Sequence, residues 1–274
     1  MTPLISTDEL AAVLGAPDLR LIDGSWHLDG RDAAAQFAEA HIPGTVFFDL
    51  EAVSDADSPL PHMLPTAEAF AASVGALGVG ADDHIVVYDT AGLFSAARVW
   101  WMFRTMGASR VQVLDGGLPK WLAEGRAVTA DARLPVAAVF TASFAPDAVV
   151  DAEQVCAALA AHAQVVDARG AARFRGEAAE PRPGVRAGHM PGALNLPYNR
   201  LLNDDGTMKR GQALAQVFAD AGVDVARPVT TTCGSGVTAA ILSLGLAELG
   251  RPSQLYDGSW ADWSGRADTP VTTG

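Results

Sequence analysis

Cys233 is the residue of this sequence best suited to nucleophilic chemistry. The stretch from Thr230 to Ala240 reads as a strand, a tight turn with glycines and the beginning of a helix. A thiol at the carboxyl end of a buried strand, directly before a helix, faces several backbone N–H groups and the positive end of the helix dipole. Such surroundings lower a thiol pKa from about 8.5 and favour the reactive thiolate. The alternative interpretation is a buried core cysteine that precedes a glycine-containing connection.

The second cysteine, Cys156, lies within the apolar stretch Val155–Leu159 and is typical of a core residue. Because the surroundings of the two cysteines differ so much, we expect no structural disulfide between them. No Cys/His pair stands at ligand spacing, so the sequence predicts no metal site. His41 and His189 each come two positions before a proline and a glycine, and we expect them to support turns.

The composition limits the classes of partner. The chain has 274 residues, with 32 acidic side chains against 19 Lys and Arg and a formal net charge of −13. Since no basic run breaks this acidic background, nucleic acid and anionic membrane surfaces are not expected partners. The first residues lack the pattern of an export signal, and no apolar segment reaches about 18 residues. We therefore expect a soluble, cytoplasmic protein.

The elements that must position Cys233 occur twice, because the sequence contains an internal repeat. Matching segments follow one another in the same order in both halves: Leu21–Asp23 with Val165–Asp167, His41–Gly44 with His189–Gly192, and Asp115–Gly117 with Asp257–Ser259. The strand-like run His84–Tyr88 ends at Asp89, where the matching run 228–232 ends at Cys233. The repeat therefore predicts one active loop per chain.

Each copy of the repeat alternates short apolar strands with Ala- and Leu-rich helical stretches. This pattern predicts an α/β fold with a mainly parallel sheet flanked by helices on both faces. In the second copy, residues 237–249 should form a helix that Gly250 closes in a left-handed conformation. Residues 127–150 show little periodic pattern and favour a connection between domains. We place the domains at residues 1–130 and 149–274, with a linker at 131–148.

The loop Cys233–Ala239, the duplicated organisation and the two His-x-Pro-Gly segments resemble tandem-domain rhodaneses over Leu10–Pro270. The resemblance implies two tandem rhodanese-like domains, of which the amino-terminal one is an inactive copy with Asp89 in place of the cysteine. It also implies that Cys233 carries sulfur as a persulfide and passes it to thioredoxin, a small thiol or cyanide, without a cofactor. The substrate and the persulfide would be bound by loop residues, namely Gly234, Gly236, Val237 and Thr238.

Within this family, the loop looks like that of members that use 3-mercaptopyruvate as the sulfur donor. Members that use thiosulfate typically carry basic residues just after the cysteine, whereas this sequence has Gly234 and Ser235. The resemblance further implies that Arg173 and Arg182 hold the carboxylate of the donor, a task that suits planar guanidinium groups. Two neighbouring arginines, Arg175 and Arg186, are interpreted as solvated loop charges.

The resemblance implies a proton relay in which His62 connects the loop hydroxyl of Ser235 to an acidic residue. The matching acid here is Glu51, where the family usually has an aspartate. Because glutamate is one methylene longer, such a relay must be arranged differently or does not operate. As the alternatives, His62 is an ordinary loop histidine between prolines and Glu51 is a surface carboxylate.

Three other functions fit parts of the sequence. A thiosulfate sulfurtransferase would have the same fold and chemistry with another donor. A cysteine phosphatase would need an arginine six residues after its nucleophile, and Ala239 stands there instead. A rhodanese module that only presents its persulfide to a partner protein would need neither two full domains nor a donor clamp.

Overall fold

The computed structural model of the chain describes residues 1–131 and 134–274. Residues 132 and 133 of the linker expected at 131–148 therefore lie outside the described residues. The described chain divides into two compact units, each of which includes a short segment from elsewhere in the sequence. Unit 1 comprises Met1–Ala56, Leu64–Ala145 and Asn203–Met208, and unit 2 comprises Asp57–Met63, Pro146–Leu202 and Lys209–Gly274.

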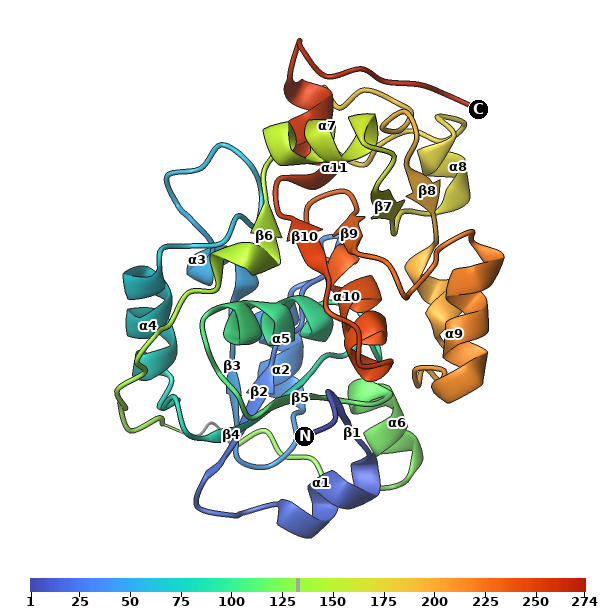
Figure 1. The fold of residues 1–274 in the computed structure, drawn as a ribbon. Helices are drawn as coiled ribbons and strands as arrows, with labels where there is room; N and C mark the ends of the chain where they lie inside the picture. Colours follow the sequence, from blue (N-terminus) through green and yellow to red (C-terminus); the bar gives the residue numbers. More distant parts are fainter. Residues whose placement is uncertain (132–133) are drawn as a thin grey trace. The chain divides into compact units, whose positions relative to one another are not determined.

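Unit 1 is built on a parallel sheet of five strands in the order β1-β5-β4-β2-β3 (Figure 1). The strands, within the described residues, are β1 (Leu4–Ile5), β2 (Leu19–Asp23), β3 (Thr45–Phe47), β4 (His84–Tyr88) and β5 (Val111–Leu114). The helices are α1 (Thr7–Val13), α2 (Ala33–Glu39), α3 (Leu50–Val53), α4 (Ala67–Ala76), α5 (Ala96–Thr105) and α6 (Gly117–Ala123).

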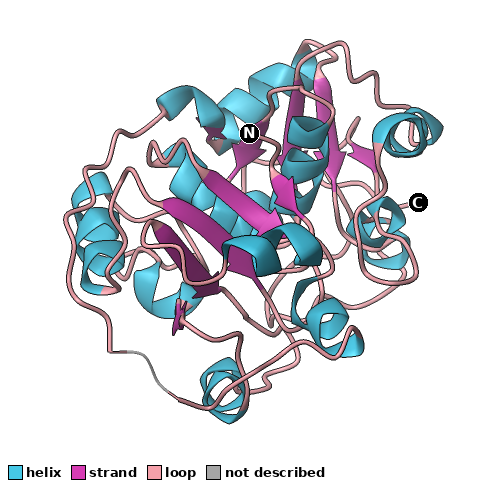
Figure 2. Ribbon diagram, turned by 90° about the horizontal axis from the view of Figure 1, so that it is seen from below, coloured by secondary structure: helices cyan, strands magenta, loops and turns pink. Residues whose placement is uncertain are grey.

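Unit 2 repeats this order with its own parallel five-stranded sheet, β6-β10-β9-β7-β8. Its strands are β6 (Val149–Val150), β7 (Gln164–Asp167), β8 (Leu194–Asn195), β9 (Val229–Thr232) and β10 (Gln254–Tyr256). Its α-helices are α7 (Ala152–Ala160), α8 (Ala171–Phe174), α9 (Gly211–Asp220), α10 (Ala239–Glu248) and α11 (Ser259–Gly265), with 3-10 turns at Pro146–Ala148 and Tyr198–Leu201. Strands and flanking helices alternate in both units (Figure 2), which confirms the predicted fold class.

Local sequence signals explain where the helices begin and end. Ser6 and Asp151 cap α1 and α7: the side chain of each accepts the backbone N–H three residues later, and the side chain of that later residue accepts the backbone N–H of the cap. Helix α10 begins at Ala239, two residues later than expected, because Val237 and Thr238 belong to the loop that follows β9. Gly250 follows α10 with a φ of 69°, which confirms the predicted left-handed end.

Residues that recur in both copies of the repeat have the same role in each unit. Trp121 packs in the core of unit 1 beside Tyr88, and Trp263 packs in the core of unit 2 beside Tyr256. The turn-supporting role expected of the two repeated histidines is confirmed. His41 Nδ1 lies 2.7 Å from the Phe37 carbonyl, and His189 Nδ1 lies 2.8 Å from the Phe174 carbonyl.

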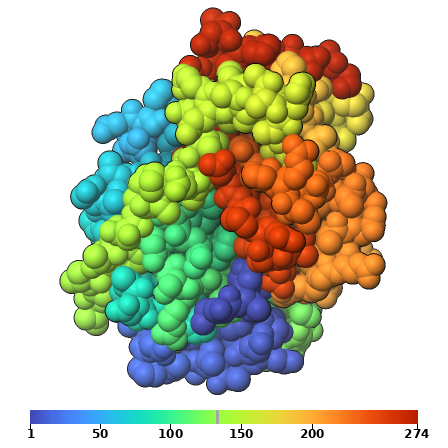
Figure 3. Space-filling view, in the orientation of Figure 1, coloured from blue at the N-terminus to red at the C-terminus, as the bar shows by residue number. Residues whose placement is uncertain are grey.

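Cys156 is exposed on α7, so its interpretation as a core residue was wrong. Helix α7 buries Ala152 and Val155, which are one turn apart, and this phase leaves Cys156 on the solvent side. The helix lies at the molecular surface in the view of Figure 3. Both cysteines are free thiols, in agreement with the expectation of no disulfide.

Asp23 and Asp167 end equivalent strands but have different partners. Asp167 Oδ2 pairs with Arg169 Nη2 at 2.7 Å. The position that matches Arg169 is occupied by Ser25, whose backbone N–H donates to Asp23 Oδ1 at 2.9 Å. Asp23 Oδ2 is buried and accepts no hydrogen bond from the described residues. Burial without a cationic partner raises the pKa of Asp23 to about 6.

Replacing Asp23 with asparagine is expected to raise the free energy of unfolding at neutral pH by about 1 to 3 kcal/mol. The contribution of Asp23 to stability is complete below its unfolded pKa of 3.8, and it is lost as the pH rises through the folded value of about 6. Urea denaturation at a series of pH values should therefore give a flatter profile for Asp23→Asn. Parallel profiles for the variant and the parent would contradict this account.

Candidate active site

Cys233 occupies the predicted position between the carboxyl end of β9 and the beginning of α10. It is 2% exposed. Among the residues that the structure describes, the amides of Cys233 and Gly236 bond to Ser259, and no acceptor is present for four other loop N–H groups. These four belong to Gly234, Ser235, Val237 and Thr238. The loop therefore combines a thiol with backbone donors that can stabilise an anion.

The matching loop of unit 1 contains its own anion. Asp89 follows β4, and its Oδ2 accepts hydrogen bonds from the amides of Phe94 at 2.7 Å and Ala96 at 2.8 Å. Its Oδ1 accepts another from Ala91 at 2.9 Å. Burial raises the pKa of Asp89, while these amide hydrogen bonds oppose that shift. The amides of this loop are thus occupied by a carboxylate of the loop itself.

Arg173, a predicted donor-binding residue, lies beside the Cys233 loop. A β-carbon placed on Gly234 would lie 3.1 Å from Arg173 Nη2, so glycine permits the close approach of the guanidinium group. Arg173 Nη2 also lies 2.5 Å from Glu180 Oε2, and Arg173 Nε lies 3.3 Å from Glu180 Oε1. Glu180 therefore sets the direction of Arg173, which is still partly exposed and able to meet a ligand.

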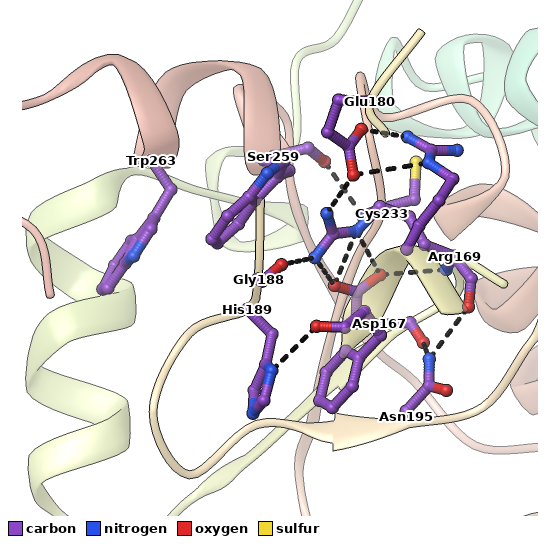
Figure 4. A network of polar contacts seen from close by, with 12 residues as sticks. Asp167, Arg169, Glu180, Gly188, His189, Asn195, Cys233, Ser259 and Trp263 are labelled. Carbon is purple, nitrogen blue, oxygen red and sulfur yellow. Dashed lines mark hydrogen bonds and ion pairs between the residues drawn. The ribbon is translucent and has the colours of Figure 1, made fainter. Parts of the chain in front are cut away.

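Arg169 forms an ion pair with Glu180 from the interior of unit 2 (Figure 4). Neither residue was predicted from the sequence to belong to the site. The Arg169 side chain is fully buried and lies over the ring of Trp260 at 4.4 Å. Its Nη1 donates to Glu180 Oε1 at 2.8 Å, while its Nε and Nη2 donate to Asp167. A signal existed in the repeat, because Ser25 stands at the position of Arg169 in the first copy. An arginine just after a buried strand needs acidic partners nearby.

His62 and Ser235 are brought together within unit 2. His62 Nδ1 lies 3.1 Å from Ser235 Oγ, and the two residues are 2% and 5% exposed. His62 adopts a φ of 60°, an uncommon conformation for a residue with a β-carbon. Glu51 belongs to unit 1, where its Oε1 accepts a hydrogen bond from Trp26 Nε1 at 2.8 Å. Its participation in a relay with His62 stays a prediction.

The remaining arginines of this region differ in their surroundings. Arg182 is half-buried in the loop between α8 and β8. Arg175 pairs with Glu177 at the surface, as expected of a loop charge. Arg186 is not a solvated charge, because it donates to backbone carbonyls at the end of α11 and just after it, including Ser264 at 2.6 Å and Arg266 at 2.9 Å. It fixes the carboxyl-terminal segment of unit 2.

Comparisons with known proteins agree with this geometry. The family model for the rhodanese-like domain matches residues 6–124 and 151–266. A 3-mercaptopyruvate sulfurtransferase of Escherichia coli K12 is 46% identical over 277 residues, which cover 98% of each chain. A thiosulfate sulfurtransferase of Gallus gallus is 42% identical and covers 91% of this chain and 87% of its own.

A solved structure supports the same assignment. The crystal structure of an Escherichia coli 3-mercaptopyruvate sulfotransferase, described as having the rhodanese fold, superimposes with a TM-score of 0.87 at 43% identity. It covers 95% of this chain and 99% of its own. Within the described residues, no helix has the length and apolar character needed to cross a membrane. The chain belongs to the rhodanese-like family and carries two copies of its domain.

Proposed function

We propose that this chain is a sulfurtransferase that takes sulfur from 3-mercaptopyruvate. The Cys233 thiolate forms a bond to the donor sulfur, and the carbon–sulfur bond of the donor breaks. The electron pair of that bond leaves with the pyruvate fragment as an enolate, which then takes up a proton. Cys233 keeps the sulfur as a persulfide. The observation that carries this proposal is the thiol within a loop that offers four open amide donors.

The choice of donor rests on where positive charge lies. The residues directly after Cys233 are Gly234 and Ser235, so the loop has no cationic side chain to bind the sulfonate end of thiosulfate. Arg173 reaches the loop from α8 and is proposed to bind the carboxylate of mercaptopyruvate together with Arg182. Sequence identity alone does not choose the donor, because relatives named for either donor match at similar identity.

Proton delivery is assigned to the loop hydroxyl. We propose that Ser235 protonates the carbonyl end of the departing enolate, with His62 as its hydrogen-bond partner. Glu51 would complete this relay as the acidic member. The amides of Gly234, Gly236, Val237 and Thr238 are assigned to binding of the substrate and the persulfide, although Gly236 N is held by Ser259.

The proposal also covers the domain bounds, the sulfur acceptors and the location of the protein. Residues 1–130 form an inactive rhodanese-like domain, residues 131–148 a linker and residues 149–274 the catalytic domain. The Cys233 persulfide passes its outer sulfur to thioredoxin, to a small thiol or to cyanide. The reaction needs neither a cofactor nor a metal, and the protein acts in the cytoplasm.

The proposal is tested by intact mass spectrometry after incubation with 3-mercaptopyruvate. We expect a gain of one sulfur atom, located at Cys233 by peptide mapping, together with release of pyruvate. Parallel kinetics with thiosulfate should give a lower kcat/KM than mercaptopyruvate. A higher kcat/KM with thiosulfate would replace the proposed donor, and sulfur on Cys156 alone would contradict the mechanism.

A further inference from the structure

Ser259 has a backbone conformation that serine rarely adopts. It is the first residue of α11, it is fully buried, and its φ is 50°. The matching residue of unit 1 is Gly117, the first residue of α6, with a φ of 55°. Glycine adopts this left-handed region without steric cost, whereas a residue with a β-carbon loses stability there. Both units therefore share the left-handed backbone conformation at this position, and only unit 2 has a side chain there.

The Ser259 hydroxyl binds both ends of the turn that carries Cys233. Its Oγ accepts the amide hydrogens of Cys233 at 3.2 Å and Gly236 at 3.1 Å, and it donates to the Tyr256 carbonyl at 2.8 Å. A hydroxyl group has one donor and two acceptor positions, so all three are used. Figure 4 shows Ser259 beside Cys233 in this network.

The backbone of α11 adds two more hydrogen bonds to the same loop. The Trp260 amide donates to the Cys233 carbonyl at 2.9 Å, and the Ala261 amide donates to the Gly234 carbonyl at 2.9 Å. With the hydroxyl of Ser259, four hydrogen bonds join the first turn of α11 to the loop. The loop is thus held from the side of α11.

The loop of unit 1 is held by a different set of hydrogen bonds. Leu118 donates to the Asp89 carbonyl at 3.0 Å, but the next residue is Pro119, which has no N–H. A β-carbon on Gly117 would lie 2.6 Å from the carbonyl oxygens of both Asp89 and Gly92, so no side chain fits. In this loop the Asp89 carboxylate accepts the amides of Ala91, Phe94 and Ala96.

We infer that Ser259 is a positioning residue that holds the Cys233 loop in its reactive shape. It accepts the amides of Cys233 and Gly236, a contact that the glycine at the matching position of unit 1 cannot make. The amides at 234, 235, 237 and 238 then stay without an acceptor in the described chain and are available to an anion bound at the loop. This inference rests on the proposed function, because it assigns the loop the task of stabilising a thiolate and a persulfide.

The test compares Ser259→Gly and Ser259→Ala with the parent chain. Glycine keeps the backbone conformation that Gly117 shows to be compatible with the turn, and it removes only the hydroxymethyl group. We expect kcat for pyruvate release to fall roughly tenfold or more, with KM for mercaptopyruvate unchanged. Alkylation of Cys233 by iodoacetamide should become several-fold slower at neutral pH.

Ser243→Ala is the matched control. Ser243 is also a buried serine of unit 2, and its hydroxyl lies 2.9 Å from Thr231 Oγ1, away from the loop amides. Ser243→Ala should lose about as much stability as Ser259→Gly. It should keep the kcat of the parent and the parent's rate of Cys233 alkylation. The melting temperature of Ser259→Gly should stay within about 5 °C of that of the control.

Each result decides the inference. An unchanged kcat or an unchanged rate of Cys233 alkylation in a folded Ser259 variant would overturn the inference. Failure of Ser259→Gly to fold would also overturn it, because the inferred role lies in reactivity and not in folding. If the parent releases no pyruvate from mercaptopyruvate, the proposed function fails by itself. The rate of Cys233 alkylation is measured without a sulfur donor, so it still tests the positioning role of Ser259 in that case.

Discussion

Cys233→Ser is expected to lower the rate of pyruvate release from 3-mercaptopyruvate by more than about 10⁴-fold and to abolish the gain of sulfur in mass spectrometry. A serine hydroxyl is not ionised at neutral pH and cannot store sulfur as a persulfide. The substitution exchanges a buried sulfur atom for an oxygen atom and leaves the backbone of the loop unchanged. The loss should therefore appear in kcat while the variant melts near the temperature of the parent.

Cys156→Ser provides the control for this prediction. It changes the other free thiol, which is exposed on α7, and it should keep full turnover and the full gain of sulfur. Substantial turnover of Cys233→Ser with any donor would mean that the sulfur does not pass through Cys233. The central step of the mechanism would then be wrong.

Glu180→Gln is expected to raise KM for 3-mercaptopyruvate about 10- to 100-fold, which corresponds to roughly 1.4 to 2.8 kcal/mol of donor binding. Glu180 is the ion-pair partner that directs Arg173, and it also receives Nη1 of the buried Arg169. A neutral amide keeps the shape but loses charge-assisted hydrogen bonds to both guanidinium groups. Steady-state kinetics over a wide range of donor concentration measures the effect.

The matched control for Glu180 is Glu177→Gln. Glu177 also forms an ion pair with an arginine of this region, Arg175, but both side chains are exposed. An exposed pair contributes little, so KM should remain within about twofold of the parent value. Equal KM changes in the two variants would show that general charge, rather than the direction of Arg173, controls binding of the donor.

The sequence was sufficient to predict the elements that depend on local signals. The β-branched run before Cys233 and the glycines after it determined a strand and a turn, and the repeat located Asp89 at the matching point. Gly250 marked the end of α10 because a left-handed residue commonly follows a helix. Such features depend on neighbours in the chain, which a single sequence contains.

Side chains whose partners are distant in sequence could not be assigned in this way. Arg186 contacts carbonyls of residues 263–269, and this requires the path of the carboxyl-terminal segment. The pairing of Arg169 with Glu180 depends on how the loop after α8 folds back. Cys156 was misjudged because an Ala-rich helix gives a weak indication of which face is buried. These assignments come from tertiary packing.

The carboxylate of Asp89 shows how far the loop of unit 1 has diverged from the Cys233 loop. This carboxylate accepts the amides of Ala91, Phe94 and Ala96, so only a change at position 89 would make them available to another anion. Gly117 also leaves no space for a side chain such as that of Ser259. The loop between Asp89 and Ala96 is also one residue longer than that between Cys233 and Ala239. The two loops therefore differ at several positions and in length, so a loop like that of Cys233 would need more than one change in unit 1.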